Sequence, residues 1–284
     1  SDDRILSPMV RNDQGQLTKV SWAAALERIV QAFPENASQI GLAVGTRLSV
    51  EDGHMLLRLG RGLLKTPNVV HEHEAESLGT NTTLTGRVKG CDAADVILCL
   101  GSDPAKSHHD FELRIKKGLR NKARLICIGE QPALVGYADY QVIGVASELW
   151  SKLKKELKKE TTEEESGLRF PKPRPWEAGG ETSQDWDALV KEIRGAENVL
   201  VVVSGDIAGQ GLQDVARDVE DLGWNTAPHG VIHLRSGVNP VGHESIGLIP
   251  EWDEDGNQAL AKAWEGMNTD SGLSYAEMCR GKTE

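Results

Sequence analysis

The pattern of apolar and polar positions predicts an α/β protein with parallel sheets. Uninterrupted apolar runs cover Val96–Leu100 and Leu125–Ile128, and a glycine follows each run. Runs of this length suit strands that are covered on both faces, as parallel strands are. Between the two runs, apolar residues recur every four positions along an expected helix: Phe111, Ile115 and Leu119. Residues 95–130 are therefore expected to form a βαβ unit of a doubly wound, mostly parallel sheet with helices on both faces.

Similar patterns extend over the rest of the chain. We expect an extended segment with a turn at residues 7–17, and strands at residues 40–45, 140–145 and 198–204. Ser21 is expected to cap a helix that ends before Pro34. Further helices are expected at residues 49–64, 148–159, 186–193, 213–222, 259–264 and 275–279. Residues 229–250 contain four glycines and two prolines and are expected to form a loop.

The order of these elements predicts two Rossmann-like lobes. The first α/β lobe is expected at residues 1–160 and the second at residues 186–284, with its C-terminal end cut short. Residues 161–185 are rich in proline, glycine and charge, and we expect an irregular connection there. Phe170 and Trp176 are the side chains expected to anchor this connection on a domain surface.

Composition and charge limit the possible functions. The chain has 284 residues and a net charge of -11, which argues against nonspecific binding to nucleic acid. The sequence contains neither an apolar run long enough for a membrane span nor a signal peptide, so the chain is expected to be cytoplasmic or an excised piece. The four cysteines, Cys91, Cys99, Cys127 and Cys279, include no Cys-x-x-Cys pair and are expected to be reduced thiols. The first three lie in or beside strands that are expected to be buried.

Three short segments offer candidate chemistry. The turn after Gly101 lies where ligands bind in such sheets, although Ser102 or Asp103 could simply cap the next helix. The segment HEHEAE at residues 71–76 could provide metal ligands, but a solvated charged segment is the favoured interpretation, and the His108–His109 pair is interpreted similarly. The glycines of GDIAGQG at residues 205–211 lack dinucleotide-binding spacing, so a plain strand-to-helix turn is favoured.

Several segments together resemble the large subunits of the molybdopterin oxidoreductase superfamily. The resemblance follows the family's order along nearly the whole chain and rests on five segments: residues 7–29 (SPMVRNDQGQLTKVSWAAALERI), 94–130, 138–145, 198–211 and 238–250 (VNPVGHESIGLIP). It implies two Rossmann-like lobes. In catalytic members it also implies a pterin-based metal cofactor, whose guanosine and phosphates would contact six residues here: Gly101, Ser102, Asp103, Pro104, His108 and Glu130.

The chain also departs from the catalytic members of this family. In the formate dehydrogenase branch, the segment resembling residues 68–77 contains an arginine and a cysteine or selenocysteine that binds the metal, and Glu74 and Glu76 stand at those positions here. The family's Pro-Gly-Thr-Asp cofactor loop is absent, since residues 144–147 read GVAS. A carboxylate beside an anionic dithiolene cofactor would be repelled.

The chain keeps the segments of the family's fold but lacks the residues that bind the metal. In this respect it is similar to the large peripheral-arm subunits of NADH-quinone oxidoreductase, respiratory complex I. That resemblance implies a non-catalytic scaffold without a molybdenum cofactor, in a parent that carries iron–sulfur clusters and transfers electrons from NADH to quinone. It implies other peripheral-arm subunits as partners, with neither nucleic-acid binding nor membrane insertion, on the cytoplasmic side of the inner membrane. A cofactor-binding fragment of a Mo or W oxidoreductase and a stand-alone Rossmann-like nucleotide-binding protein remain alternatives.

Overall fold

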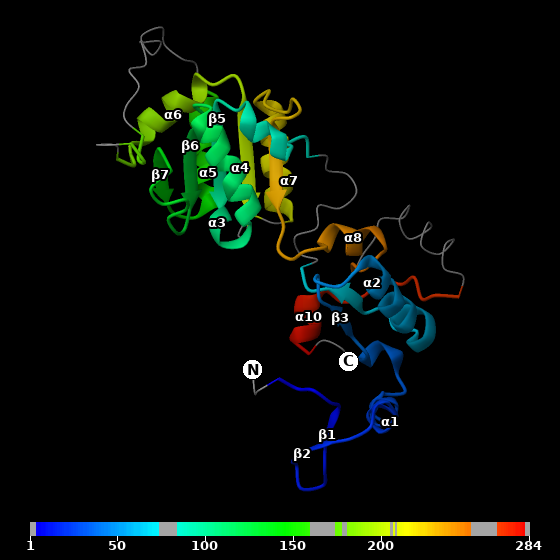
Figure 1. The fold of residues 1–284 in the computed structure, drawn as a ribbon. Helices are drawn as coiled ribbons and strands as arrows, with labels where there is room; N and C mark the ends of the chain where they lie inside the picture. Colours follow the sequence, from blue (N-terminus) through cyan, green and yellow to red (C-terminus); the bar gives the residue numbers. More distant parts are fainter. Residues whose placement is uncertain are drawn as a thin grey trace. The chain divides into compact units, whose positions relative to one another are not determined.

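The computed structural model describes residues 4–73, 84–159, 174–177, 181–204, 207, 209–250 and 266–281. The chain forms two compact units (Figure 1). The first unit combines residues 1–72 with residues 241–284, and the second comprises residues 73–240. These limits differ from the expected lobes at residues 1–160 and 186–284, because strands from both ranges join one sheet in the second unit.

The second unit is built on a five-stranded parallel sheet with the order β7-β6-β5-β8-β9. The strands are β5 (Val96–Gly101), β6 (Arg124–Gly129), β7 (Tyr140–Ile143), β8 (Val199–Ser204) and β9 (Gly230–Leu234). The first four confirm the expected strands. The expectation of a loop throughout residues 229–250 was wrong, because β9 and helix α8 (Pro240–Ser245) lie there.

Helices cover both faces of this sheet, as the apolar runs predicted. On one face, α4 (His109–Arg120) packs its stripe of Phe111, Ile115 and Leu119 against alternate strand residues such as Ile97 and Leu125. The opposite face holds the intervening strand residues and three helices: α5 (Ala146–Leu157), α6 (Trp186–Arg194) and α7 (Gln210–Asp221). The second unit is therefore a doubly wound α/β fold.

Two shorter elements and one connection complete the described part of the second unit. A 3₁₀ helix, η4 (Val88–Asp92), precedes β5, and α3 (Pro104–Ser107) follows it. In the connection before α6, Arg174 donates hydrogen bonds to the carbonyl oxygens of Lys122 and Ala123, and the Trp176 ring lies 5.9 Å from the Tyr137 ring. The anchoring expected of Trp176 is confirmed, whereas Phe170 lies outside the described residues.

The first unit begins with a hairpin and a capped helix. Strands β1 (Met9–Arg11) and β2 (Leu17–Lys19) pair antiparallel, and Ser21 caps α1 (Trp22–Ala32) through the Ala24 amide, as expected. A 3₁₀ turn, η1 (Ala37–Gln39), leads to β3 (Leu42–Val44), which pairs in parallel with β4 (Val69–His71). Between these strands the expected single helix divides into α2 (Val50–Leu57) and the π-helical η2 (Arg58–Leu64).

The two parts of the chain that form the first unit are joined by buried polar side chains. Asn68 donates to the carbonyl oxygen of Ser38 at 2.9 Å and accepts from the Leu273 amide at 2.9 Å. Arg61 donates to the carbonyl oxygens of Asn268 and Asp270 at 3.0 and 2.9 Å. The last helix is α10 (Tyr275–Cys279), as expected, while residues 259–264 lie outside the described ranges. Of the helices described, none is long and apolar enough to cross a membrane.

Candidate functional site

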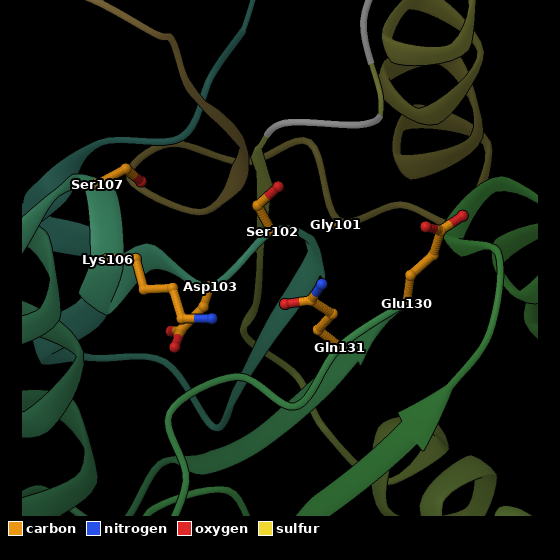
Figure 2. Close-up of a pocket in the computed structure, with 7 residues that line it drawn as sticks. All are labelled: Gly101, Ser102, Asp103, Lys106, Ser107, Glu130 and Gln131. Atoms are coloured by element: carbon orange, nitrogen blue, oxygen red, sulfur yellow. The ribbon is translucent and has the colours of Figure 1, made fainter.

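A pocket opens at the carboxyl ends of β5 and β6, where the sequence predicted a site. Its volume is about 260 Å³, near the lower limit for small-molecule sites. Three short segments line it: Gly101–Asp103 after β5, Lys106 and Ser107 on α3, and Glu130 and Gln131 after β6. Figure 2 shows these residues arranged around the opening. The doubly wound fold therefore brings together residues from two neighbouring strand ends.

Two glycines allow the strand ends to meet so closely. A Cβ on Gly129 would collide with the backbone carbonyl oxygen of Gly101 on the neighbouring strand. Gly101 itself has a φ of 97°, a conformation that favours glycine. The shape of the pocket thus depends on the residue types at these two positions.

Asp103 has a structural task in the turn. Its carboxylate caps α3 by accepting a hydrogen bond from the Ala105 amide at 3.1 Å, and it also accepts one from the Leu134 amide at 3.2 Å. Pro104 occupies the first turn of α3 and is buried, which suits a residue without an N–H. The capping role considered for Asp103 is therefore confirmed, and the same oxygen atom serves both amides.

His108 lies between α3 and α4 and does not line the pocket. Its Nδ1 lies 2.8 Å from Ser107 Oγ, and its Nε2 lies 3.0 Å from the carbonyl oxygen of Arg235. His109 is 78% exposed and lies 3.8 Å from a Glu112 carboxylate oxygen. The contacts of His108 join the turn to the segment after β9.

The structure brings together four of the six residues named from the sequence. Gly101, Ser102, Asp103 and Glu130 line the pocket, while Pro104 and His108 lie beside it in the same turn. Sequence reasoning missed three lining residues: Lys106, Ser107 and Gln131. Their signal was positional, because Lys106 and Ser107 belong to the first helical turn after Pro104, and Gln131 follows the second predicted strand.

The charges in the pocket limit its chemistry. Asp103 and Glu130 contribute carboxylates, and Lys106 contributes the cation among the lining residues. Phosphate groups bind best where backbone amides and cations outnumber acids. The lining therefore suits a ligand that donates hydrogen bonds to these carboxylates better than it suits a strongly anionic ligand.

The histidine-rich segment starts inside the first unit. His71 is fully buried at the end of β4, so the expectation of a solvated segment was wrong for this residue. Its Nε2 lies 3.6 Å from a Glu244 carboxylate oxygen, and its ring centroid lies 6.2 Å from that of His243. Glu72 accepts hydrogen bonds from the Thr46 amide and hydroxyl at 3.1 and 3.2 Å.

Among the residues that the structure describes, no three His, Cys, Asp or Glu side chains form a group suited to a metal ion. Glu74 and Glu76 lie outside the described residues, as do Gly205, Asp206 and Ala208 of the glycine-rich turn. The described part of that turn ends in α7, whose first residue is Gln210.

Three cysteines are buried in the second unit, as expected, and Cys279 is exposed. Burial is the main cause that raises the pKa of the Cys91 thiol to about 12. The pKa of the Cys99 thiol is also raised, first by its hydrogen bond with Cys127 and then by burial. Because the thiolate is the form that binds metals, Cys91 and Cys99 are poor ligands at neutral pH.

Comparison with known proteins assigns a family to this fold. The family model "Molybdopterin oxidoreductase" matches residues 4–166, more than half of the chain. The match covers the first unit up to β4, together with β5, β6, β7 and α5 of the second unit. It also includes every residue of the pocket.

Two curated proteins illustrate the similarity. The chain is 23% identical over 346 aligned positions to the alpha subunit of an F420-dependent formate dehydrogenase from Methanocaldococcus jannaschii, covering 98% of this chain and 47% of that protein. It is 33% identical over 94 positions to the G subunit of the NADH-quinone oxidoreductase of Streptomyces coelicolor, covering 31% of this chain and 11% of that protein. The chain thus spans about half the length of the first relative.

A solved structure, acetylene hydratase from Pelobacter acetylenicus, aligns with 49% of this chain and 21% of its own at 17% identity, with a TM-score of 0.35. The assignment rests on the family model and on the parallel sheet with helices on both faces. The chain belongs to the molybdopterin oxidoreductase family.

Proposed function

We propose that this chain is a non-catalytic scaffold portion of a G-type subunit of NADH-quinone oxidoreductase and binds no molybdenum cofactor. The parent complex would transfer electrons from NADH to quinone through iron–sulfur clusters that lie outside this chain. The chain would contribute a rigid α/β body that packs against neighbouring peripheral-arm subunits on the cytoplasmic side of the membrane.

The observation that carries this proposal is the position of the cysteines in the sequence and in the fold. The segment at residues 68–77 contains no cysteine, and the acids Glu74 and Glu76 stand where the resemblance to the formate dehydrogenase branch implies an arginine and a soft ligand. Cys91, Cys99 and Cys127 are buried in the core of the second unit, where their packing is structural. These donors do not fit a thiolate-bound Mo or W centre, so we derive no chemistry through one.

Two further observations support the scaffold role. The pocket lining contains two carboxylates and one lysine, which is unfavourable for a cofactor rich in phosphate. The identity to the Streptomyces coelicolor protein reaches 33%, although over 94 positions only. The relatives from Methanocaldococcus jannaschii and Streptomyces coelicolor are both named as subunits, which favours a subunit of a larger assembly over a stand-alone protein.

Metal analysis tests the absence of the cofactor. The chain would be produced in cells that make the cofactor and are supplied with molybdate and tungstate, with a formate dehydrogenase from the same cells as positive control. We expect Mo and W far below one atom per chain, no extractable pterin and no visible absorption. Metal near one atom per chain, together with pterin, would contradict the proposal.

Isolation of the tagged parent protein from its own cells tests the assignment to the complex. We expect NADH-dependent reduction of a quinone analogue to co-purify with the tag, in a particle much larger than the chain. Co-purification of formate-dependent reduction of F420, without quinone reduction, would favour the formate dehydrogenase branch.

The pocket supports a second candidate, in which the chain binds the guanine nucleotide part of a pterin cofactor. The specific observation is the glycine turn after β5, beside which the pocket is lined by three side chains that carry hydrogen-bond donors, Ser102, Lys106 and Gln131. Calorimetric titration with guanosine diphosphate, with adenosine diphosphate as the matched control, tests it. A heat of binding with guanosine diphosphate but not with adenosine diphosphate, and a smaller one in Gln131→Ala, would support this candidate. No heat of binding with either nucleotide would exclude it.

A further inference from the structure

The pocket at the carboxyl ends of β5 and β6 contains carboxylate oxygens that are available to a ligand. The Glu130 side chain makes no hydrogen bond or ion pair with any residue that the structure describes. Asp103 accepts its two hydrogen bonds, from the Ala105 and Leu134 amides, at a single oxygen, Oδ1. Its other oxygen, Oδ2, has no partner in the described part of the chain. The two strand ends therefore each contribute a carboxylate with acceptor capacity to spare.

The backbone amides of the turn after β5 are already engaged. The Ser102 amide donates to a carbonyl oxygen at the end of β8 at 3.4 Å, and the Lys106 amide donates to the carbonyl oxygen of Asp103 at 3.1 Å. The Ala105 amide donates to the Asp103 carboxylate, and Pro104 has no N–H. Phosphate groups are held by backbone amides that point at the ligand, and these four positions offer none.

The charge of the lining favours a ligand with one positive charge. One lysine against two carboxylates leaves a net charge of -1 on the lining residues. Figure 2 shows Glu130 on the opposite side of the opening from Lys106. No ion pair joins Lys106 to either carboxylate within the described ranges. A monovalent cation beside Glu130 would neutralise the lining.

The remaining lining groups favour a flat cation with several donors. The hydroxyls of Ser102 and Ser107 and the amide oxygen of Gln131 can all accept hydrogen bonds. A guanidinium group is planar, carries five N–H donors and pairs with a carboxylate through two parallel hydrogen bonds. An ammonium group has three donors and is more strongly hydrated. A metal ion fits less well, since the described residues include no group of three His, Cys, Asp or Glu ligands.

We propose that this pocket binds the guanidinium group of a small organic cation. Glu130 is the principal partner and accepts two parallel hydrogen bonds, while Asp103, Ser102 and Gln131 accept from the other edges of the group. This ligand requires that no pterin nucleotide occupies the pocket, so the inference rests on the proposed function in that respect. The dissociation constant expected of a ligand with so few atoms is about 1 mM.

Titration with three butyl compounds, followed by the amide NMR shifts of the chain, tests the ligand class. We expect butylguanidinium to shift the amides of the pocket residues, with a dissociation constant of about 1 mM. Butylurea has nearly the same shape without the charge and should bind at least about tenfold more weakly. Butylammonium has the charge without the planar fork and should bind at least about threefold more weakly.

Variants of the chain test the site. Glu130→Gln removes the principal carboxylate and should weaken the binding of butylguanidinium at least about tenfold. The matched control, Glu220→Gln, removes the same charge at an exposed position on α7 outside the pocket and should leave the affinity unchanged. Lys106→Ala removes a like charge and should tighten binding about two- to fivefold. A phosphate ligand would respond to Lys106→Ala in the opposite direction, so guanosine diphosphate is titrated with the same variants.

Four results would overturn the guanidinium site. Equal affinity for butylguanidinium and either of the other two compounds would mean that the pocket does not recognise the group. Equal effects of Glu130→Gln and Glu220→Gln would place the cation elsewhere on this acidic chain. Binding of guanosine diphosphate that Lys106→Ala weakens would assign the pocket to a nucleotide. Absence of binding by all three butyl compounds would exclude the site but leave the scaffold role, which metal analysis tests, unaffected.

Discussion

At the residue scale, Asp139 shows how one buried carboxylate organises an edge of the sheet. It accepts hydrogen bonds from the Arg124 guanidinium at 2.7 Å and from the Leu125 amide at 2.9 Å. Arg174 also lies within 3.4 Å of it. One side chain thus connects β6, the start of β7 and the irregular connection.

Replacing this carboxylate by its amide is expected to destabilise the second unit. Asp139→Asn removes the buried carboxylate that Arg124 and Arg174 share and leaves Arg124 with Glu192, 3.5 Å away, so it should lower the free energy of unfolding by about 2 to 3 kcal/mol. Urea denaturation measures the change. The control Asp214→Asn alters an exposed ion pair with Arg217 and should cost less than about 0.5 kcal/mol. Equal effects of the two variants would contradict this account.

The four thiols should differ sharply in reactivity. Cys279 is exposed, whereas Cys91, Cys99 and Cys127 are buried, and the pKa of Cys91 is raised to about 12. A disulfide reagent at pH 8 should therefore label one thiol quickly in the native chain and four in denaturant. Cys279→Ser should abolish the fast phase. Rapid labelling of a second thiol would show that the core opens.

The Cys91 thiol also makes stability depend on alkaline pH. The pKa of Cys91 is raised in the folded state, from 9.0 to about 12, so the stabilisation from its neutral form is complete below pH 9. It is lost progressively as the pH rises from 9 toward 12, because the unfolded chain releases its proton first. We expect the free energy of unfolding to fall between pH 9 and pH 10.5, and to fall less in Cys91→Ala. An identical decline in both proteins would exclude this cause.

At the element scale, close helix–strand packing in the first unit depends on a glycine. A Cβ on Gly60 of η2 would collide with Val69 on β4 and would lie 2.8 Å from a methyl carbon of Leu42 on β3. Gly62, two positions later, has its nearest neighbour, Met267 Cε, at 3.7 Å. The two glycines therefore differ in the space around them although they share one helix.

Gly60→Ala is expected to destabilise the first unit by about 1 to 3 kcal/mol through overpacking. Gly62→Ala should be neutral or slightly stabilising, because alanine favours helix more than glycine does. Thermal unfolding of both variants checks the difference. A Gly60→Ala protein with unchanged thermal stability would mean that η2 shifts readily on the β3–β4 sheet.

Sequence patterns predicted most strands and helices because their signals are local. The apolar runs that became β5, β6 and β8 had no competing interpretation, and the Ser21 and Asp103 caps followed from residue type. Strand β9 was missed because its five residues lie among glycines and prolines, and its pairing with β8 is a tertiary effect. The π-helical turn η2 has the same apolar spacing as an α-helix and could not be distinguished.

The candidate site could be placed from the sequence, but its composition could not. Its place follows from strand order, since carboxyl ends of parallel strands meet at one edge. Lys106 and Gln131 line the pocket because of how α3 and the turn after β6 are oriented. His108 points toward the segment after β9 instead, a contact that depends on residues far along the chain.

At the scale of the whole molecule, the two units differ in continuity. The second unit is one uninterrupted stretch, residues 73–240, whereas the first needs both ends of the chain. Buried Asn68 and Arg61 join those ends through bonds to Leu273, Asn268 and Asp270. The expected boundary near residue 160 falls inside the second unit, because pairing of β5 with β8 crosses it.

A fragment comprising residues 73–240 should therefore fold alone. We expect it to unfold cooperatively in urea and to keep its buried cysteines unreactive, because both faces of its sheet are covered by its own helices. A fragment of residues 1–72 should not fold until residues 241–284 are added. If the fragment of residues 73–240 failed to fold, the first unit would be needed to stabilise the five-stranded sheet.

The position of β8 next to β5 has a consequence for synthesis on the ribosome. About 100 residues separate these neighbouring strands, and translation at about 5 to 20 residues per second delivers the second one roughly 5 to 20 s after the first. During that interval one side of β5 has no partner strand, although its apolar residues are already made. The nascent chain must therefore shield this edge with a chaperone or with its own transient structure, and slowing the ribosome before residue 199 should increase aggregation.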